Sequence, residues 1–257
     1  MIPHVARICR YPVKGLSGED LDRITLTAGR ALPDDRRFAI ARGSAKIDTA
    51  NPGWASKDNF VTLLRTDRLA QLRTRYDADT GELEIARGKR TVAKGRITGP
   101  TGRTVIDQFL AAFLKDDVQR TPKLVDAGTV ALTDEGEPVV SVLNLASVRD
   151  LTRVTGKRID PVRFRANLLV DGLAPWAERQ WPGAKIRVGG TMLEIIEPIT
   201  RCAATDVNPE TAQRDTNLPK LLQRGYGQPT MGVYAIVREG ATISVNDPVV
   251  PPEPPDA

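Results

Sequence analysis

The stretch AKIRVGGTMLEIIEPI, residues 184–199, decides the fold class, because two aliphatic and β-branched runs flank a Gly-Gly pair. Two such runs separated by two glycines are typical of a β-hairpin, since glycine adopts the positive φ angles of a tight turn. No other segment of the chain predicts a hairpin as strongly. TRCAATD follows at 200–206, where we expect the strand to open into a polar loop.

Further short strands are expected on both sides of this hairpin, since the chain alternates short apolar runs with Gly- and Pro-containing turns. The expected strands are HVARICRYPV (4–13), LDRITLTAG (21–29), RRFAIAR (36–42), a hairpin in QLRTRYDADTGELEIARG (71–88), PVVSVLN (138–144), RFRANLLVDG (163–172) and two strands in MGVYAIVREGATISVNDPVVP (231–251). NFVTLLR at 59–65 fits a helix or a strand equally well.

Three segments have helical character. In TVIDQFLAAFLK (104–115), Val105, Phe109, Ala112 and Phe113 recur at helical spacing, which predicts an amphipathic helix. LASVRDLTRVTG predicts a helix that ends at its final glycine, and LPKLLQRGYG a short helix with a glycine stop. The chain is therefore predicted to be mainly β with a few helices (α+β).

The domain organisation follows from the same pattern. Short strands and turns predict a β-barrel-like N-terminal module over residues 1–115, and a change of composition near 116–135 separates it from a second domain over 116–250. The tail PPEPPDA, residues 251–257, is predicted to be disordered because it is too rich in proline to fold.

Composition narrows the classes of function. A net charge of +5 fits a mildly basic protein or a basic pocket for an anionic ligand. Nucleic-acid binding is disfavoured, because the basic residues are interleaved with acidic ones and aromatic residues make up only 5%. No apolar run is long enough for a membrane span, and no secretory signal is recognised, so we expect a cytoplasmic protein.

Cysteine and histidine are scarce. Cys9 and Cys202 are the two cysteines, and a disulfide framework is not expected in a cytoplasmic chain with so few. The one histidine, His4, lies next to a terminus, which disfavours a histidine-based zinc site or a Ser-His-Asp triad.

Cys202 is the residue most suited to chemistry. It follows a predicted strand, and its neighbour Arg201 would favour the thiolate, the form that binds soft metals. The simpler interpretation is a small buried apolar side chain, and that interpretation is stronger still for Cys9 in the middle of a strand.

Basic residues offer possible anion sites. Lys14 lies in the turn YPVKGLSG, where backbone N–H groups and an ammonium can meet an oxyanion. In DDRRFAI, Arg36 and Arg37 should face opposite sides of a strand, so only one of them can enter a given site.

The segment RFRANLL is the second basic candidate. Arg163, Arg165 and Asn167 have i, i+2 spacing, so we expect them on one face of a strand, as a platform for a phosphate or another oxyanion. For each arginine taken alone, a solvated surface charge is the simpler interpretation. Asp134 in ALTDEGEP and Asp247 in VNDP are interpreted as turn residues.

Taken together and in order, these motifs resemble one family. YPVKGLSG and DDRRFAI resemble the MOSC N-terminal β-barrel module. RFRANLLVDG, TRCAATDVNPET and GVYAIVREGATISVNDPV resemble the MOSC domain itself. The resemblance covers roughly residues 4–250. It implies a MOSC-type β-barrel core behind an N-terminal β-barrel-like module, with the mitochondrial amidoxime-reducing component and its bacterial counterparts as functional relatives and the molybdenum-cofactor sulfurases as more distant ones.

The resemblance also implies a cofactor site. Cys202 matches the cysteine that ligates molybdenum in the family. Lys14 and Arg36 match residues on the phosphate side of the pterin, and Arg165 and Asn167 match the cofactor-binding FRPN motif. The remaining residues of the predicted cofactor site are Gly15, Asp134, Arg163, Thr200 and Arg201.

Some positions depart from the family pattern. Gly15 stands where the family often has serine, which removes a hydroxyl contact, and Ala166 replaces the proline of FRPN. TDEGEP differs from the usual middle segment, and Asp134 is carried over from it. The four-cysteine ferredoxin domain of many bacterial relatives has no counterpart here.

The function implied is that of a molybdenum-cofactor (molybdopterin) oxidoreductase that reduces N-hydroxylated compounds or N-oxides. Its electrons would come from a separate ferredoxin- or cytochrome-type donor with its reductase, and pyridoxal phosphate would not be required. Cys202 and Asp206 are the predicted catalytic residues, because proton delivery falls to water or carboxylates in a chain with one histidine. Two alternatives are open: a cofactor carrier or sulfuration protein with a persulfide on Cys202, and a basic scaffold without cofactor.

Overall fold

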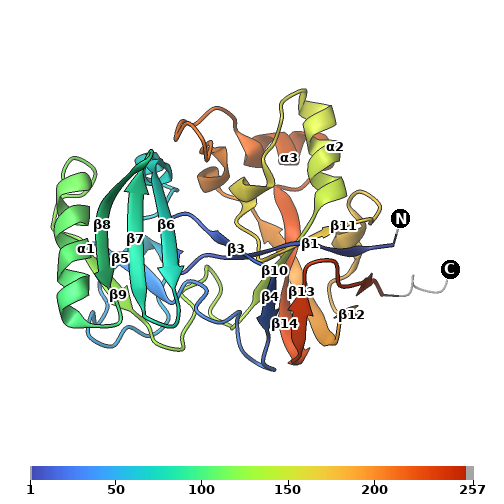
Figure 1. Ribbon diagram of the computed structural model, residues 1–257. Helices are drawn as coiled ribbons and strands as arrows, with labels where there is room; N and C mark the ends of the chain where they lie inside the picture. The colour runs from blue at the N-terminus through green and yellow to red at the C-terminus, as the bar shows by residue number, and fades with distance from the viewer. Residues whose placement is uncertain (1, 253–257) are drawn as a thin grey trace.

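The computed structural model describes residues 2–252, which form two units side by side (Figure 1). The larger unit is built on an eight-stranded sheet with strand order β16-β12-β13-β14-β10-β11-β1-β3. Its strands are β1 (His4–Arg10), β3 (Glu19–Leu21), β10 (Val140–Asn144), β11 (Leu168–Asp171), β12 (Lys185–Val188), β13 (Thr191–Thr200), β14 (Thr230–Glu239) and β16 (Val249–Val250). A two-stranded sheet, β4 (Arg23–Thr25) with β15 (Thr242–Ser244), lies beside it.

The quoted hairpin lies near one edge of this sheet, where β16 flanks it on the outer side. β12 and β13 pair in antiparallel fashion with Val188 opposite Thr191, so the turn consists of the two glycines, the first with φ of 53°. β13 pairs with β14 from Met192 to Thr200, with three irregularities of register, and the candidate site lies at the end of β13. Val188, Leu193, Val233 and Ala235 are buried in the core beneath the sheet.

The helices of the larger unit cover its upper end in Figure 1: α2 (Leu145–Thr155) and α3 (Leu218–Tyr226). α2 ends at Gly156 with φ of 64°, as the sequence predicts. Among residues 2–252, none of the helices has the length and apolar character needed to cross a bilayer.

The smaller unit has its own core. A sheet of β2 (Val13–Lys14), β5 (Phe38–Ala41) and β9 (Lys123–Asp126) lies near a meander of β6 (Leu72–Asp77), β7 (Glu82–Arg87) and β8 (Arg90–Arg96). Helix α1 (Pro100–Phe113) packs on the meander through Ile106, Leu110 and Phe113, whereas Val105 of the predicted apolar face is 43% exposed.

The mainly β class with a few helices is confirmed, but the sheets do not close into barrels. The eight-stranded sheet ends at β3 and β16, which have three and two residues and are not paired with each other.

The two units do not divide at one point of the sequence. β1 lies inside the sheet of the larger unit, between β11 and β3, and Val5 and Ile8 belong to that unit's core. The boundary between residues 115 and 116 stays a prediction. Most of the predicted tail, residues 253–257, lies outside the described residues.

Two local predictions were wrong. Residues 60–65 form neither helix nor strand, since Asn59 ends a short 3-10 turn (η1, Lys57–Asn59) and Phe60 makes an isolated bridge to Ala41. Residues 161–164 form a 3-10 turn (η3, Pro161–Phe164) in place of a strand, because Asp160 accepts a hydrogen bond from the Val162 N–H and Pro161 starts the turn. β11 begins only at Leu168.

Candidate functional site

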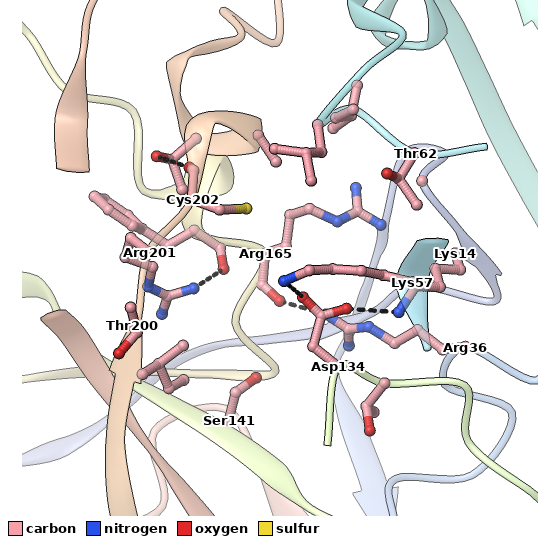
Figure 2. Close-up of a pocket in the computed structure, with 18 of the residues that line it drawn as sticks. Lys14, Arg36, Lys57, Thr62, Asp134, Ser141, Arg165, Thr200, Arg201 and Cys202 are labelled. Atoms are coloured by element: carbon pink, nitrogen blue, oxygen red, sulfur yellow. Dashed lines mark hydrogen bonds and ion pairs between the residues drawn. The ribbon is translucent and has the colours of Figure 1, made fainter. Parts of the chain in front are cut away.

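A cavity with about 910 Å³ of empty space, part of it open to solvent, lies between the two units. All predicted cofactor-binding residues line it: Lys14, Gly15, Arg36, Asp134, Arg163, Arg165, Asn167, Thr200, Arg201 and Cys202. Asp206 is not among the lining residues. Figure 2 shows how side chains from both units point into one space.

Asp134 joins two lysines at the cavity wall (Figure 2). Its carboxylate accepts from the Lys14 ammonium at 2.6 Å and contacts the Lys57 ammonium at 3.5 Å. Lys14 is 6% exposed at the end of β2, and it also donates to the carbonyl of Leu132 at 2.8 Å. Burial lowers the pKa of Lys14, against the opposing effect of Asp134. Burial alone would raise the pKa of Asp134, but the two lysines outweigh it and bring that pKa below its usual value.

Gly15 follows Lys14 because the chain must turn sharply there. Its φ is 90°, and a Cβ at this position would lie 2.9 Å from the carbonyl oxygen of Val61. A side chain would therefore be strained by the backbone and by a contact with it. This geometry is a physical reason for glycine at a position where the family often has serine.

Arg36 and Arg165 share one aromatic ring. Their guanidinium carbons lie 4.6 and 4.3 Å from the ring centre of Tyr11. Arg36 pairs with Asp35 and donates to the carbonyl of Arg165 at 2.6 Å. The φ angle of Arg165, 52°, directs the Arg165 carbonyl toward Arg36. The Arg165 guanidinium donates to the carbonyl of Leu16 at 2.6 Å.

One nitrogen of Arg165 is left over. Nη2 is buried and has no hydrogen-bond partner among the described residues. Burial lowers the pKa of Arg165 to about 10, and the nearby Arg36 adds to this effect. A buried guanidinium N–H without an acceptor is costly, so the position favours an anionic ligand that would supply one.

Arg201 is a second buried guanidinium held by carbonyls. It donates from Nε to Met231 at 2.8 Å and from Nη1 to Phe164 at 2.9 Å. Burial lowers its pKa to about 10. Gly232, with φ of 72°, allows the close approach, because a Cβ there would lie 3.3 Å from Nη2 of Arg201 and 2.6 Å from the carbonyl of Val142.

Cys202 comes directly after Arg201, where the chain has left β13. It is half-buried, and its sulfur points into the cavity (Figure 2). Its carbonyl caps the 3-10 turn η5 (Ala203–Asp206), accepting from the Thr205 N–H at 3.1 Å and hydroxyl at 2.9 Å. Cys9 lies elsewhere, 3% exposed, and burial raises the pKa of its thiol to about 12.

Arg163 and Asn167 line the cavity but use their polar groups elsewhere. The guanidinium of Arg163 donates to Asp215 at 2.8 Å and to the carbonyl of Asp206 at 3.1 Å. The Asn167 amide accepts from the Ser141 hydroxyl at 2.8 Å and donates to the carbonyl of Cys9 at 3.2 Å. The expectation of one strand face for Arg163, Arg165 and Asn167 was wrong, since the turn at 161–165 rotates the side chains apart.

Asp206 has a structural role outside the cavity lining. Its carboxylate accepts from the N–H of Leu218 at 2.8 Å, at the start of α3, and burial raises its pKa. A role in proton delivery stays a prediction.

Two of the lining residues that sequence reasoning missed are titratable, Lys57 and Tyr234. Lys57 lies in a loop whose sequence has no periodicity. The one local signal is Ser56, a residue type that often caps turns; its side chain accepts a hydrogen bond from the Asp58 N–H in a short 3-10 turn. Tyr234 lies in GVYAIV on β14, opposite Ser141 of β10. Burial raises its pKa to about 12.

The cavity carries excess positive charge. Six lining side chains are cationic, namely Lys14, Arg36, Lys57, Arg163, Arg165 and Arg201, and one lining carboxylate, Asp134, faces them. Asp35 and Asp215, outside the lining, pair with Arg36 and Arg163. Within the described part of the chain no carboxylate lies within ion-pair distance of Arg165 or Arg201, so three positive charges remain uncompensated by these pairs. Such a cavity suits an anionic ligand.

Comparisons with known proteins cover nearly the whole chain. Residues 2–127 match the model of the MOSC N-terminal beta barrel domain, and residues 128–250 match that of the MOSC domain. The chain is 28% identical to the human mitochondrial amidoxime-reducing component 1, in a match that covers 95% of this chain and 82% of that protein. It is 23% identical to a molybdenum cofactor sulfurase of Caenorhabditis elegans over 90% of this chain, and it spans 33% of that protein's length. The YUAD protein of Bacillus subtilis is a structural neighbour with a TM-score of 0.47, 12% identity and coverage of 97% of this chain and 94% of that one.

Proposed function

The chain belongs to the MOSC family, with a MOSC N-terminal beta barrel domain ahead of a MOSC domain, and on that premise we propose that it binds the molybdenum cofactor in the cavity between its units. We propose further that it reduces N-hydroxylated compounds or N-oxides. The amidoxime-reducing relative supports this activity, and the sulfurase relative supports the cofactor.

The donor set of the cavity fits this group. The cofactor carries a phosphate, and the uncompensated charge together with the orphaned Nη2 of Arg165 supports an oxyanion at that wall. Lys14, Arg36 and Arg165 would hold the phosphate side, and Cys202 would bind the metal through its thiolate. The single observation that carries the proposal is the Cys202 sulfur, which faces the same cavity as these guanidiniums (Figure 2).

When bound, the cofactor supplies the two-electron chemistry that cleaves an N–O bond. The protein orients it. Arg201 and Arg165 are fixed by backbone carbonyls, so their charges need no rearrangement when the anionic ligand is in place.

Protons must also reach the substrate. Conversion of an N–OH group to N–H consumes two electrons and two protons and releases water. Lys57 carries a proton on Nζ at neutral pH, as lysine side chains do, and its side chain is 39% exposed and so can be reprotonated from solvent. We assign the first proton transfer to this ammonium, with water as the further source.

Electrons would come from a separate donor of ferredoxin or cytochrome type with its reductase. Residues 1–257 contain two cysteines, one of them Cys202, which is fewer than the four that a ferredoxin-type cluster needs. Cytoplasmic residence is part of the same proposal.

A second candidate function is that of a cofactor carrier or sulfuration protein. Cys202 favours it, because a half-buried thiol that has no hydrogen-bond partner among the described residues can also carry a persulfide. This function predicts bound cofactor or persulfide without turnover under any reductant.

The test compares wild type, Cys202→Ala and the control Cys9→Ala, all produced in a host that makes the cofactor. We expect about one molybdenum per chain in wild type and Cys9→Ala, and loss of the metal in Cys202→Ala. With a chemical electron donor, wild type and Cys9→Ala should reduce an aromatic amidoxime. Wild-type protein without molybdenum, from a host with verified cofactor supply, would refute the proposal. Molybdenum without turnover would favour the carrier.

A further inference from the structure

The segment that follows Cys202 folds as a hairpin of its own. Val207 and Arg214 form an antiparallel bridge, and the N–H of Asn208 donates to the carbonyl of Gln213 at 2.7 Å. The N–H of Ala212 donates back to the carbonyl of Asn208 at 2.9 Å. The segment over residues 206–215 is therefore held in shape by its own backbone hydrogen bonds.

The base of this hairpin is fastened to the larger unit. The Arg163 guanidinium, 4% exposed, donates to the carbonyl of Asp206 at 3.1 Å and pairs with Asp215 at 2.8 Å. These two residues are the first and the last of the hairpin, so one buried side chain fixes both of its ends.

The outer side of the hairpin is hydrogen-bonded to the smaller unit through two arginines, one from the hairpin and one from the smaller unit. Arg214 donates from Nη2 to the carbonyls of Leu63 and Leu64 at 2.7 and 3.0 Å. Arg73 of β6 donates to the carbonyl of Pro209 at 2.5 Å. Leu63 and Leu64 are cavity-lining residues, so the contacts of Arg214 lie directly behind the cavity wall.

Arg214 also reaches the residue next to the proposed metal ligand. Its Nη1 donates to the carbonyl of Ala203 at 2.6 Å, while Asp67 stands farther off, 3.6 Å from its Nε. One guanidinium thus joins the backbone after Cys202 to the backbone of the other unit. The planar fork of arginine makes this possible, and a lysine ammonium would not span the same carbonyls.

From this geometry we infer that Arg214 is a positioning residue, which holds the Cys202 segment against the smaller unit and so fixes this wall of the cavity. The positioning follows from the contacts alone. The consequence for cofactor retention rests on the proposed function.

The test uses the full-length protein, with wild type, Arg214→Gln, Arg214→Lys and the control Arg65→Gln. Arg65 makes an exposed pair with Asp58 at 2.9 Å and does not touch the hairpin. Hydrogen–deuterium exchange of peptides covering 203–216 gives a readout that needs no cofactor. We expect exchange to rise about tenfold in Arg214→Gln, since hydrogen bonds from a charged donor are lost, and to rise less in Arg214→Lys. The control should match wild type.

Molybdenum retention after gel filtration, and the visible absorption of a metal–thiolate bond, give the second readout. We expect faster metal loss and an altered absorption band in Arg214→Gln, with partial rescue in Arg214→Lys. Unchanged exchange together with unchanged retention would overturn the inference. If Arg214→Gln lowers the global unfolding midpoint, Arg73→Gln, which loosens the opposite contact, must raise exchange in 203–216 for the inference to stand. Wild type without molybdenum would contradict the proposed function, while the exchange comparison would still decide the positioning role.

Discussion

Removal of one negative charge at Asp134 should destabilise the protein measurably. Asp134→Asn keeps the size of the side chain but deprives Lys14, which is 6% exposed, of its carboxylate at 2.6 Å. Breaking a fully buried pair destabilises by about 3–5 kcal/mol. The Asp134 side chain is 41% exposed, so water screens part of the interaction and we expect a loss of about 2 kcal/mol. For a chain of this length that lowers the unfolding midpoint by roughly 4–8 °C.

Urea and thermal unfolding at pH 7 measure this loss. The matched control is Asp117→Asn, whose partner Arg68 lies at 3.0 Å with both side chains partly exposed, and its loss should stay below about 1 kcal/mol. The pH dependence gives a second check. The pKa of Asp134 is lowered in the folded state, so its contribution is present above about pH 4 and is lost as the pH falls further. The two unfolding curves of wild type and Asp134→Asn should therefore converge in acid. A loss no greater than that of the control, at neutral pH, would refute the reasoning.

Three further predictions concern single positions. Gly15→Ala should lower the free energy of unfolding in urea by about 1 kcal/mol more than Gly128→Ala does. Both glycines have positive φ, but only at Gly15 would the new Cβ lie 2.9 Å from a backbone oxygen, so equal losses would contradict this reasoning. Iodoacetamide at neutral pH should alkylate Cys202 in cofactor-free native protein and leave Cys9 unmodified by peptide mass spectrometry, since burial raises the pKa of Cys9 to about 12; early labelling of Cys9 would count against its burial. Lys57→Gln should lower kcat for an amidoxime about tenfold or more at unchanged molybdenum content, and Lys57→Arg should lower it as well, because a guanidinium keeps the charge but does not give up a proton; a kcat equal to wild type would exclude proton transfer from Lys57.

Regular elements were predictable wherever a local signal was complete. The Gly-Gly pair fixed the hairpin of β12 and β13, and the terminal glycine fixed the end of α2. The segment before β11 was mispredicted, because the Asp160–Pro161 cap outweighed the apolar alternation that follows it. The predicted barrels were also not closed, since closure depends on edge strands whose pairing no local pattern encodes.

The site was predictable mainly through family resemblance. Position in the chain gave no reason for Lys14, Asp134 and Cys202 to meet, yet all three line one cavity. Lys57 was out of reach of sequence reasoning, since its loop has no periodicity and its contact with Asp134 spans 77 residues. Sequence reasoning also could not predict the partners of Asn167, whose side-chain amide makes its hydrogen bonds with Ser141 and the carbonyl of Cys9 in the interior of the protein.

The place of β1 limits how this protein can be rearranged by recombination. Separation of the chain at residues 127 and 128 would follow the border between the two family matches, yet it would remove β1 and β3 from the sheet of the larger unit. The second half alone would carry an open strand, β11, with unpaired backbone groups at Leu168–Asp171 on the side that β1 covers, the kind of edge that recruits other chains. The two halves therefore depend on each other structurally, and a chimera that keeps the fold must take residues 4–21 and residues 128–250 from the same parent.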